Sequence, residues 1–431
     1  MSGFAVTRQP HPELDFVARR GPDQRQSIEL EGFHVHYFLA NVDGRRVMQP
    51  FVDGEIVCVF DGEIYSHPSA RTDAKVLIDL YRHHGPSFAK QLDGDFALAL
   101  YDFGLRTAVF ATDVFATKPL FVRGTEAASY GSALGHDSGN AIERLAASTI
   151  LEVSLDDGRR HVHPHEPFDF DHQHKTSYDD WCTAFEDAVR KRAVDPCYMP
   201  LSAGYDSGGI HCALEALGFD VKTYAIEGVE NVDVLEARTT RGEVLKMTEA
   251  IFDQHQRSLR QTTESAHYDA INFLGDHVTH HLLEDRATTG LAWIHSLAKE
   301  EGRRVFLSGQ GADETVAACR HWPGSRFPDK LEPWTDLLGG WQTAYLTKEE
   351  YVAGVLGAEG RYPFLDRAVI QEFLWLSVEL KNRYYKAPLH VYMTHRDYPF
   401  EVGVKTGFEP YPPARDRANR EREEAAKNEQ A

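Results

Sequence analysis

Apolar and polar positions alternate over short runs between residues 27 and 125. Residues 56–60 (IVCVF), 96–100 (FALAL) and 108–111 (AVFA) are examples, and each run predicts a β-strand. Between them, the apolar positions of residues 73–83 recur at helical spacing and predict one helix. The pattern therefore predicts an N-terminal α+β domain that is rich in antiparallel sheet.

A polar stretch rich in histidine, residues 161–174, interrupts this periodicity. We place a domain boundary there, which gives one domain over residues 1–165 and a second over residues 166–413. Clustered histidines can bind a metal ion, but their irregular spacing is more typical of a solvated linker. Residues 414–431 are almost wholly charged or small, which is typical of a frayed helix or a disordered tail.

In the second domain, short apolar runs alternate with helical patterns, which predicts a parallel sheet covered by helices. Residues 197–201 are a short buried strand candidate, although Pro200 cannot donate to a sheet ladder. A helical pattern then runs from Ile210 to a stop at Gly218, and residues 221–226 predict the next strand. This order of elements is the start of a parallel α/β unit.

The loop of this unit, residues 201–209 (LSAGYDSGG), has the composition of a phosphate-binding turn. Small residues let successive backbone N–H groups converge on an anion, and the following helix points its N-terminus at the same place. Asp206 can hold a magnesium ion beside the phosphates. An ordinary glycine-rich turn is the alternative, and the loop matches neither the GxxxxGKS/T motif nor GxGxxG.

Residues 305–314 (VFLSGQGADE) contain a second turn of the same kind, in which a short apolar strand runs into a glycine-rich turn with carboxylates. Two such turns in one parallel sheet open on the same carboxyl edge, where ligands bind in this architecture. Asp206 and Asp313 are then partners on the magnesium ion of a bound triphosphate. Alternatively, Asp313 and Glu314 are only a charge pair at the N-terminus of a helix.

The bulk composition excludes several classes of partner. Lys and Arg number 46 against 66 Asp and Glu, and the net charge of −20 argues against binding to nucleic acid or to an anionic membrane. Five cysteines without CxxC spacing fit reduced thiols better than disulfides or a zinc site. We find no secretion-signal pattern and no apolar stretch of about 20 residues, so we expect a cytoplasmic protein.

The motifs together resemble the asparagine synthetase family. Residues 201–207 resemble its SGGxDS pyrophosphatase loop, with Ala203 in place of the first glycine and Gly208 in place of a common serine. The other matching segments are residues 307–314 (LSGEGADE in the family), 359–366 (ExRxPFLD), 404–408 (KxGF) and, in the order of the glutaminase domain, 19–23, 49–50, 61–65, 92–97 and 118–120. The resemblance implies an Ntn-hydrolase-like α+β sandwich followed by an α/β domain of the adenine nucleotide α-hydrolase-like, PP-loop type.

Three departures in the glutaminase segments change the expected function. Ser2 stands where glutamine-hydrolysing relatives have a nucleophilic cysteine, and a hydroxyl needs a strong base to attack an amide. Asp61 replaces the asparagine of the NGEIYN motif, which puts a negative charge where an oxyanion develops. The arginine that clamps the carboxylate of glutamine is missing near residues 37–40. We therefore predict that this domain makes no ammonia.

A ligase without an ammonia source takes its nucleophile most simply from the substrate's own amine. β-Lactam synthetases resemble asparagine synthetases, lack the glutaminase cysteine, adenylate a carboxylate and close a four-membered ring with an internal amine. A well-oriented tethered amine has an effective molarity of about 10⁵ M or more. The resemblance thus implies an AMP-forming ligase of natural-product biosynthesis that uses ATP and Mg²⁺ on a small amino-acid-like substrate with a carboxylate and an amine.

Other functions remain open at this point. Ammonia-dependent asparagine synthesis, peptide amidation and lasso-type cyclisation use the same adenylation. A degenerate nucleotide-binding scaffold is the alternative outside the enzymes, and a homodimer is also left open.

The resemblance also assigns roles to individual residues. Lys405 falls where β-lactam synthetases place the lysine that stabilises the oxyanion of ring closure, and a surface lysine is the alternative. The expected metal ligands are Asp206 and Asp313. The expected nucleotide-binding residues are Leu201, Ser202, Gly204, Asp206, Ser207, Gly311 and Lys386, the last of which contacts the leaving pyrophosphate.

The general base is the open position. Gln310 stands where the family has tyrosine or glutamate, and an amide cannot take a proton. A helix predicted to begin near residues 346–348 offers Glu349 and Glu350 as carboxylates. We choose Glu350 as the base that works beside Gln310, and exposed helix carboxylates without a role are the alternative.

Overall fold

The computed structural model describes residues 2–410 with several gaps. The predicted polar tail, residues 414–431, lies outside the described residues. The gaps are residues 11, 43, 45, 68–74, 136–140, 229, 240–241, 265–266, 272–276, 282–284, 318–325 and 406.

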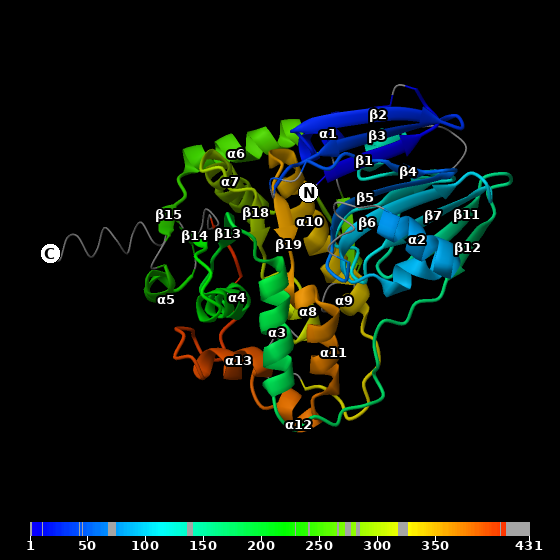
Figure 1. The fold of residues 1–431 in the computed structure, drawn as a ribbon. Helices are drawn as coiled ribbons and strands as arrows, with labels where there is room; N and C mark the ends of the chain where they lie inside the picture. The colour runs from blue at the N-terminus through cyan, green and yellow to red at the C-terminus, as the bar shows by residue number, and fades with distance from the viewer. Residues whose placement is uncertain are drawn as a thin grey trace, which may run out of the picture.

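The N-terminal half contains two antiparallel sheets of six strands each (Figure 1). The first sheet has the order β10 (Glu143–Arg144), β8 (Phe121–Arg123), β9 (Glu126–Ala128), β1 (Ser2–Thr7), β3 (Phe33–Leu39) and β2 (Gln24–Leu30). The second has the order β12 (Arg160–His163), β11 (Ile150–Ser154), β7 (Thr107–Thr112), β6 (Gly94–Asp102), β5 (Ile56–Ile64) and β4 (Phe51–Asp53).

Alternation of side chains along these strands builds the layers. Val35 of β3 and Val59 of β5 belong to one apolar cluster between the two sheets, because alternate residues of a strand point to opposite faces. Cys58 and Phe60 face the other way and pack under α2 (Lys75–His84). The outer face of the first sheet packs against α1 (Asp15–Arg20) and against α10 (Gly340–Leu356), a helix of the second half.

The C-terminal half is built on a parallel sheet of five strands. Its order is β15 (Glu243–Lys246), β14 (Lys222–Glu227), β13 (Cys197–Pro200), β18 (Val305–Leu307) and β19 (Glu359–Arg361). The surrounding helices are α3 (Asp179–Arg192), α4 (Tyr205–Ala216), α5 (Val232–Arg238), α6 (Glu249–Thr262), α7 (Arg286–Glu300), α8 (Ala312–Thr315), α9 (Thr335–Leu338), α10, α11 (Arg367–Trp375), α12 (Val378–Lys381) and α13 (Ala387–Thr394). A hairpin of β16 (His267–Ile271) and β17 (His277–His281) lies outside this sheet.

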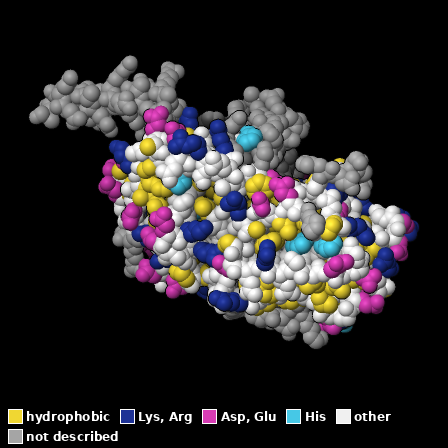
Figure 2. All heavy atoms as spheres, turned by 90° about the horizontal axis from the view of Figure 1, so that it is seen from above, with side chains coloured by type: hydrophobic (Ala, Val, Ile, Leu, Met, Phe, Trp, Pro, Cys, Tyr) yellow, Lys and Arg dark blue, Asp and Glu magenta, His cyan; other side chains and the backbone are white. Residues whose placement is uncertain are grey.

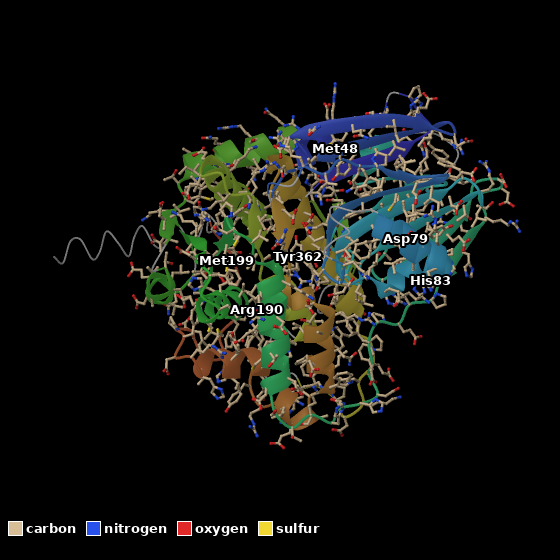
Figure 3. The ribbon with its side chains drawn as sticks, in the orientation of Figure 1. Met48, Asp79, His83, Arg190, Met199 and Tyr362 are labelled. Carbon is tan, nitrogen blue, oxygen red and sulfur yellow. The ribbon has the colours of Figure 1, made fainter. Side chains whose placement is uncertain are left out.

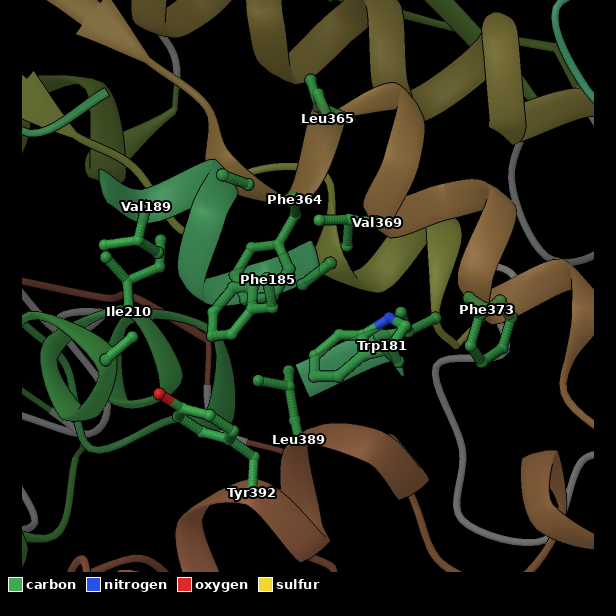
Figure 4. Close-up of a cluster of buried hydrophobic side chains, with 14 of the residues drawn as sticks. Trp181, Phe185, Val189, Ile210, Phe364, Leu365, Val369, Phe373, Leu389 and Tyr392 are labelled. Atoms are coloured by element: carbon green, nitrogen blue, oxygen red, sulfur yellow. The ribbon is translucent and has the colours of Figure 1, made fainter. Parts of the chain in front are cut away.

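A large apolar cluster joins α3, α11 and α13 (Figure 4). Phe185 of α3 stacks on Phe364 with a centroid distance of 5.0 Å, and Trp181 stacks on Phe185 at 5.1 Å. Leu389 of α13 reaches the same cluster. This core holds α13, which begins directly after Lys386, against α3 and α4.

The structure confirms the predicted fold class, a sandwich of antiparallel sheets followed by an α/β domain with a parallel sheet. The domain boundary at residue 165 stays a prediction. Over the described residues, no helix combines the length and the apolar character needed to cross a membrane. Figure 2 shows basic and acidic side chains mixed with apolar ones over the visible face, without a continuous basic field.

Candidate active site

Two glycine-rich turns meet at the carboxyl edge of the parallel sheet. They follow β13 and β18, which are neighbours in the sheet. A Cβ added to Gly309 would lie 2.9 Å from the Cβ of Asp206 and 2.9 Å from the backbone nitrogen of Ser207, so the second turn packs directly on the first. Gly311 has a φ of 98° and begins α8, a conformation that favours glycine.

The first turn holds its shape through its own serines. Ser202 N donates to Ser207 Oγ at 2.9 Å, and the two hydroxyl oxygens are 2.7 Å apart. Gly204 N donates to Ser202 Oγ at 3.2 Å, and no side chain caps the N-terminus of α4. The N-terminus of α4 thus carries the partial positive charge that favours an anion.

Arg238 stabilises this turn through hydrogen bonds to its carbonyl groups. The sequence analysis missed this residue. Its Nη1 donates to Ser202 O at 2.5 Å and to Gly204 O at 2.8 Å, and its Nε donates to Pro399 O at 2.9 Å. A Cβ at Gly208 would lie 2.6 Å from Arg238 Nη2. The glycine that replaces the family's common serine therefore leaves room for this guanidinium.

Two lysines join the carboxylates of the two turns. Lys386 Nζ forms an ion pair with Asp206 and another with Asp313 Oδ1 at 2.7 Å, and Lys405 Nζ lies 3.0 Å from Asp313 Oδ2. Burial alone would raise the pKa of Asp313, but Lys386 and Lys405 outweigh it and hold that pKa below its ordinary value. Burial, reinforced by the charge of Asp313, raises the pKa of Asp206 against the opposing effect of Lys386.

This donor set fits magnesium only together with phosphate. Over the described part of the chain, no group of three or more His, Cys, Asp or Glu residues is arranged to hold a metal ion. Asp206 and Asp313 supply two carboxylates, and Mg²⁺ commonly binds through one or two carboxylates and completes its shell with phosphate and water. The residues therefore fit a metal that arrives bound to a triphosphate.

The turns open into a cavity of about 630 Å³. Its lining includes all the predicted site residues except one: Leu201, Ser202, Gly204, Asp206, Ser207, Gln310, Gly311, Asp313, Lys386 and Lys405. Further lining comes from side chains that the sequence analysis did not assign, namely Arg286, Glu314, Tyr345, Lys348, Glu349, Phe408 and Glu409. The structure thus brings together every predicted residue but Glu350.

Glu350, which the sequence analysis chose as the general base, does not line the cavity. It is 0% exposed; its Oε2 lies 2.6 Å from Arg20 Nη2, and its Oε1 accepts from Lys118 Nζ at 2.8 Å and from Tyr362 OH at 2.7 Å. Burial would raise the pKa of Glu350, but Lys118 and Arg20 outweigh it and lower that pKa. This carboxylate is the partner of two buried cations rather than a group that faces a ligand.

The neighbouring Glu349 faces the cavity instead. Successive helical residues are turned by about 100°, so Glu349 and Glu350 lie on different faces of α10. Glu349 Oε1 accepts from Ser308 Oγ at 2.9 Å, and its buried Oε2 has no hydrogen-bond partner among the described residues. Burial raises the pKa of Glu349 to about 7, with a contribution from the charge of Glu350. That value suits a group that exchanges protons near neutral pH.

Gln310 lies beside a second buried acid. Its Nε2 donates to Glu314 Oε2 at 3.2 Å. Burial and the charge of Asp313 raise the pKa of Glu314 to about 8. Gln310 therefore orients a protonatable carboxyl group at the cavity wall, where the sequence indicated only a helix N-terminal charge pair.

The predicted glutaminase residues lie in the N-terminal half, inside a closed hydrogen-bond network. Tyr37 OH donates to Ser2 Oγ at 2.8 Å, and Gln49 Nε2 donates to Tyr37 OH at 3.2 Å. Ser2 N donates to Asp61 Oδ1 at 2.8 Å, and the other oxygen of Asp61 lies 2.7 Å from Arg20 Nε. All five side chains are buried. Asp61 is thus the counter-ion of Arg20 rather than a group that faces a ligand.

These two halves define a protein in which a glutamine amidotransferase-type sandwich is joined to a nucleotide-binding α/β domain. Residues 6–163 match the glutamine amidotransferase domain family, and residues 181–348 match the asparagine synthase family. The chain belongs to the asparagine synthetase superfamily. Its asparagine synthase domain supports the use of ATP by a carbon–nitrogen ligase.

Individual relatives agree with this membership. A Methanocaldococcus jannaschii protein assigned as a glutamine-hydrolyzing asparagine synthetase is 26% identical over 78% of this chain and 68% of its own. Asparagine synthetase 2 of Arabidopsis thaliana is 26% identical over 85% and 67%, and asparagine synthetase 1 of Saccharomyces cerevisiae is 25% identical over 82% and 71%. The chain spans about two thirds of the length of these relatives.

Proposed function

We propose that this protein is an AMP-forming amide synthetase that adenylates a substrate carboxylate and closes a ring, most simply a β-lactam, with an amine of the same molecule. The observation that carries the proposal is a contrast between the two halves. The cavity unites an anion-binding turn, two lysines and the protonatable Glu349, whereas the residues of a glutaminase site are replaced and buried.

In the first step, a carboxylate oxygen of the substrate attacks the α-phosphorus of ATP and pyrophosphate leaves. Ser202, Ser207 and the N-terminus of α4 bind the phosphates, and Lys386 neutralises the leaving pyrophosphate. Asp206 and Asp313 would hold Mg²⁺, which supplies positive charge to the triphosphate. Lys386 and Lys405 pair with Asp206 and Asp313, so two cations balance two anions at this part of the cavity wall.

In the second step, the amine nitrogen attacks the acyl carbon, and AMP leaves with the electron pair of the broken carbon–oxygen bond. Lys405 lies at the same cavity wall and would stabilise the negative oxygen of the tetrahedral intermediate. The carboxylate of Glu349 would accept the proton of the amine. Lys405 and Glu349 thus divide the electrostatic and proton-transfer work of ring closure.

The rest of the lining indicates the substrate. Arg286 lines the cavity and has no ion-pair partner among the described residues, so it would bind a second acidic group of the substrate. Tyr345 and Phe408 offer apolar contacts on the same side. We therefore propose a small amino acid that carries an additional carboxylate.

Amidation by free ammonia is the second candidate, because the relatives described above carry the name asparagine synthetase. It uses the same adenylation, and Lys405 and Glu349 would have the same roles. The difference is the source of nitrogen.

Product analysis separates the two candidates. The full chain is incubated with ATP and Mg²⁺, either with a panel of acidic β-amino acids or with aspartate plus ammonium chloride. Ring closure gives AMP and a product lighter than its substrate by one water, whereas ammonia-dependent amidation replaces a hydroxyl group by an amino group. Absence of AMP with the β-amino acids and formation of asparagine from ammonium would replace the first candidate by the second.

A further inference from the structure

The geometry points to a retained role for the N-terminal half: Arg20 and Lys118 are positioning residues that hold helix α10 and thereby aim Glu349 at the reacting amine. The inference rests on the proposed function, because it concerns the group that takes the proton in ring closure. It explains why a sandwich without a glutaminase nucleophile remains bound to the synthetase half.

The contact consists of four buried charged side chains, here called the interdomain ion cluster: Arg20, Asp61, Lys118 and Glu350. Their side chains are at most 1% exposed. Arg20 lies 2.7 Å from Asp61 and 2.6 Å from Glu350, and Lys118 lies 2.8 Å from Glu350. Two cations face two anions, so the cluster is balanced only when Glu350 of the other half is in place.

The cluster holds the main chain of α10 as well as the Glu350 side chain. Arg20 Nη1 donates to the backbone carbonyl of Glu350 at 3.3 Å. Lys118 Nζ donates to Gly360 O at 2.7 Å, which ties α10 to strand β19. Tyr362, which lies between the two halves in Figure 3, donates to Glu350 Oε1 at 2.7 Å. A carboxylate with three donors from three segments cannot rotate without breaking buried ion pairs.

The position of Glu349 depends on these contacts because Glu349 is adjacent to Glu350 on the same helix. Among the described residues its carboxylate accepts one hydrogen bond, from Ser308 Oγ, so the direction of the side chain depends on the position of the α10 backbone. The cluster also sets the electrostatic environment of Glu349. The charged groups that act on it are Lys348 and Glu350 of its own helix and Lys118 of the N-terminal half, while Lys348 is paired with Asp285 beside α7.

Hydrogen exchange of the full chain, without any substrate, tests whether Lys118 holds α10 in place. In Lys118→Met, the amides of α10 around Glu349 should exchange several-fold faster, because loss of the ion pair lowers the free energy of local opening. Lys118→Arg should restore protection. Lys191→Met is the matched control, since Lys191 pairs with Asp93 across the same two halves at 2.8 Å but lies on α3. Unchanged exchange of α10 in Lys118→Met would overturn the inference.

The pH dependence of ring closure gives the second readout, measured with ATP and the acidic β-amino acid panel. Lys118 lowers the pKa of Glu349, so its removal should move the acid limb of kcat to higher pH and lower kcat about tenfold, while ATP–pyrophosphate exchange is kept. Lys118→Arg should restore the limb. If the wild type forms no ring but the amides of α10 exchange faster in Lys118→Met, the proposed function fails and the positioning role of Lys118 stands. If the wild type forms the ring but Lys118→Met changes neither the acid limb of kcat nor the hydrogen exchange of α10, only the positioning role of Lys118 fails.

Discussion

The two halves of this molecule each carry a group of buried or half-buried polar side chains, but these side chains find their partners in opposite ways. In the N-terminal half, Ser2, Tyr37 and Asp61 satisfy one another and Arg20 inside the protein. In the C-terminal half, Asp313 and Lys405 line an open cavity, and Glu349 keeps one oxygen without a partner. The comparison teaches that similar side chains can serve as structural ion pairs in one half and remain exposed to a cavity in the other, as the proposed function requires.

The largest effect is expected from a change in the buried network. Asp61→Asn restores the amide of the family motif but removes a counter-ion of Arg20, so it should lower the free energy of unfolding by about 3–5 kcal/mol. Urea denaturation measures this loss. Asp23→Asn is the control, because Asp23 pairs with Arg304 near the surface and should cost at most about 1 kcal/mol. If Asp61→Asn lowered the free energy of unfolding by no more than Asp23→Asn does, the buried ion pair of Asp61 would not stabilise the fold.

In the cavity, Lys405→Ala should change catalysis rather than stability. Turnover should fall by about 10²–10³-fold, the scale for loss of one oxyanion donor. ATP–pyrophosphate exchange with the β-amino acid panel should persist, because Lys386 remains beside Asp206 to bind the pyrophosphate. Near-normal turnover would remove Lys405 from the mechanism.

Glu349→Gln should reduce turnover by about 10²-fold, the lower end of the range for a general base. The wild-type rate should rise with pH through about 7 and then level off, because the carboxylate accepts a proton only above its pKa. The variant should lose this acid limb, which a pH profile of kcat detects. A limb near pH 7 that survives in Glu349→Gln would belong to another group.

Much of the fold was predictable because its strands are short apolar runs between clear turns. The phosphate-binding turn was found for the same reason: β13, the glycine-rich loop and α4 are consecutive, so one local pattern describes them. The meeting of Asp206 and Asp313 was also predictable, since parallel strands end on one edge. Both inferences use local sequence together with one general rule of topology.

Local pattern did not predict which carboxylate of α10 lines the cavity. Helix α10 begins at Gly340 rather than near residue 346, and it is buried along most of its length because it lies between the two halves. A helix covered on several sides has no amphipathic pattern that tells which carboxylate faces the cavity. The role of Arg238 was hidden for a related reason, since its contacts with Ser202 O and Gly204 O join segments more than thirty residues apart.

The smallest effect is expected at the position that defines the family's glutaminase. Ser2→Ala should leave ring closure unchanged and alter the free energy of unfolding by about 0.5–1.5 kcal/mol, because one hydrogen bond from Tyr37 is lost. Ser2→Cys should release no ammonia from glutamine in a coupled assay, because Asp61 still carries a negative charge beside the backbone nitrogen of residue 2. Ammonia release by Ser2→Cys would show instead that Ser2 alone prevents glutaminase activity in this half. The difference between the structural and the reactive region would then depend on the oxygen atom of Ser2 in place of sulfur.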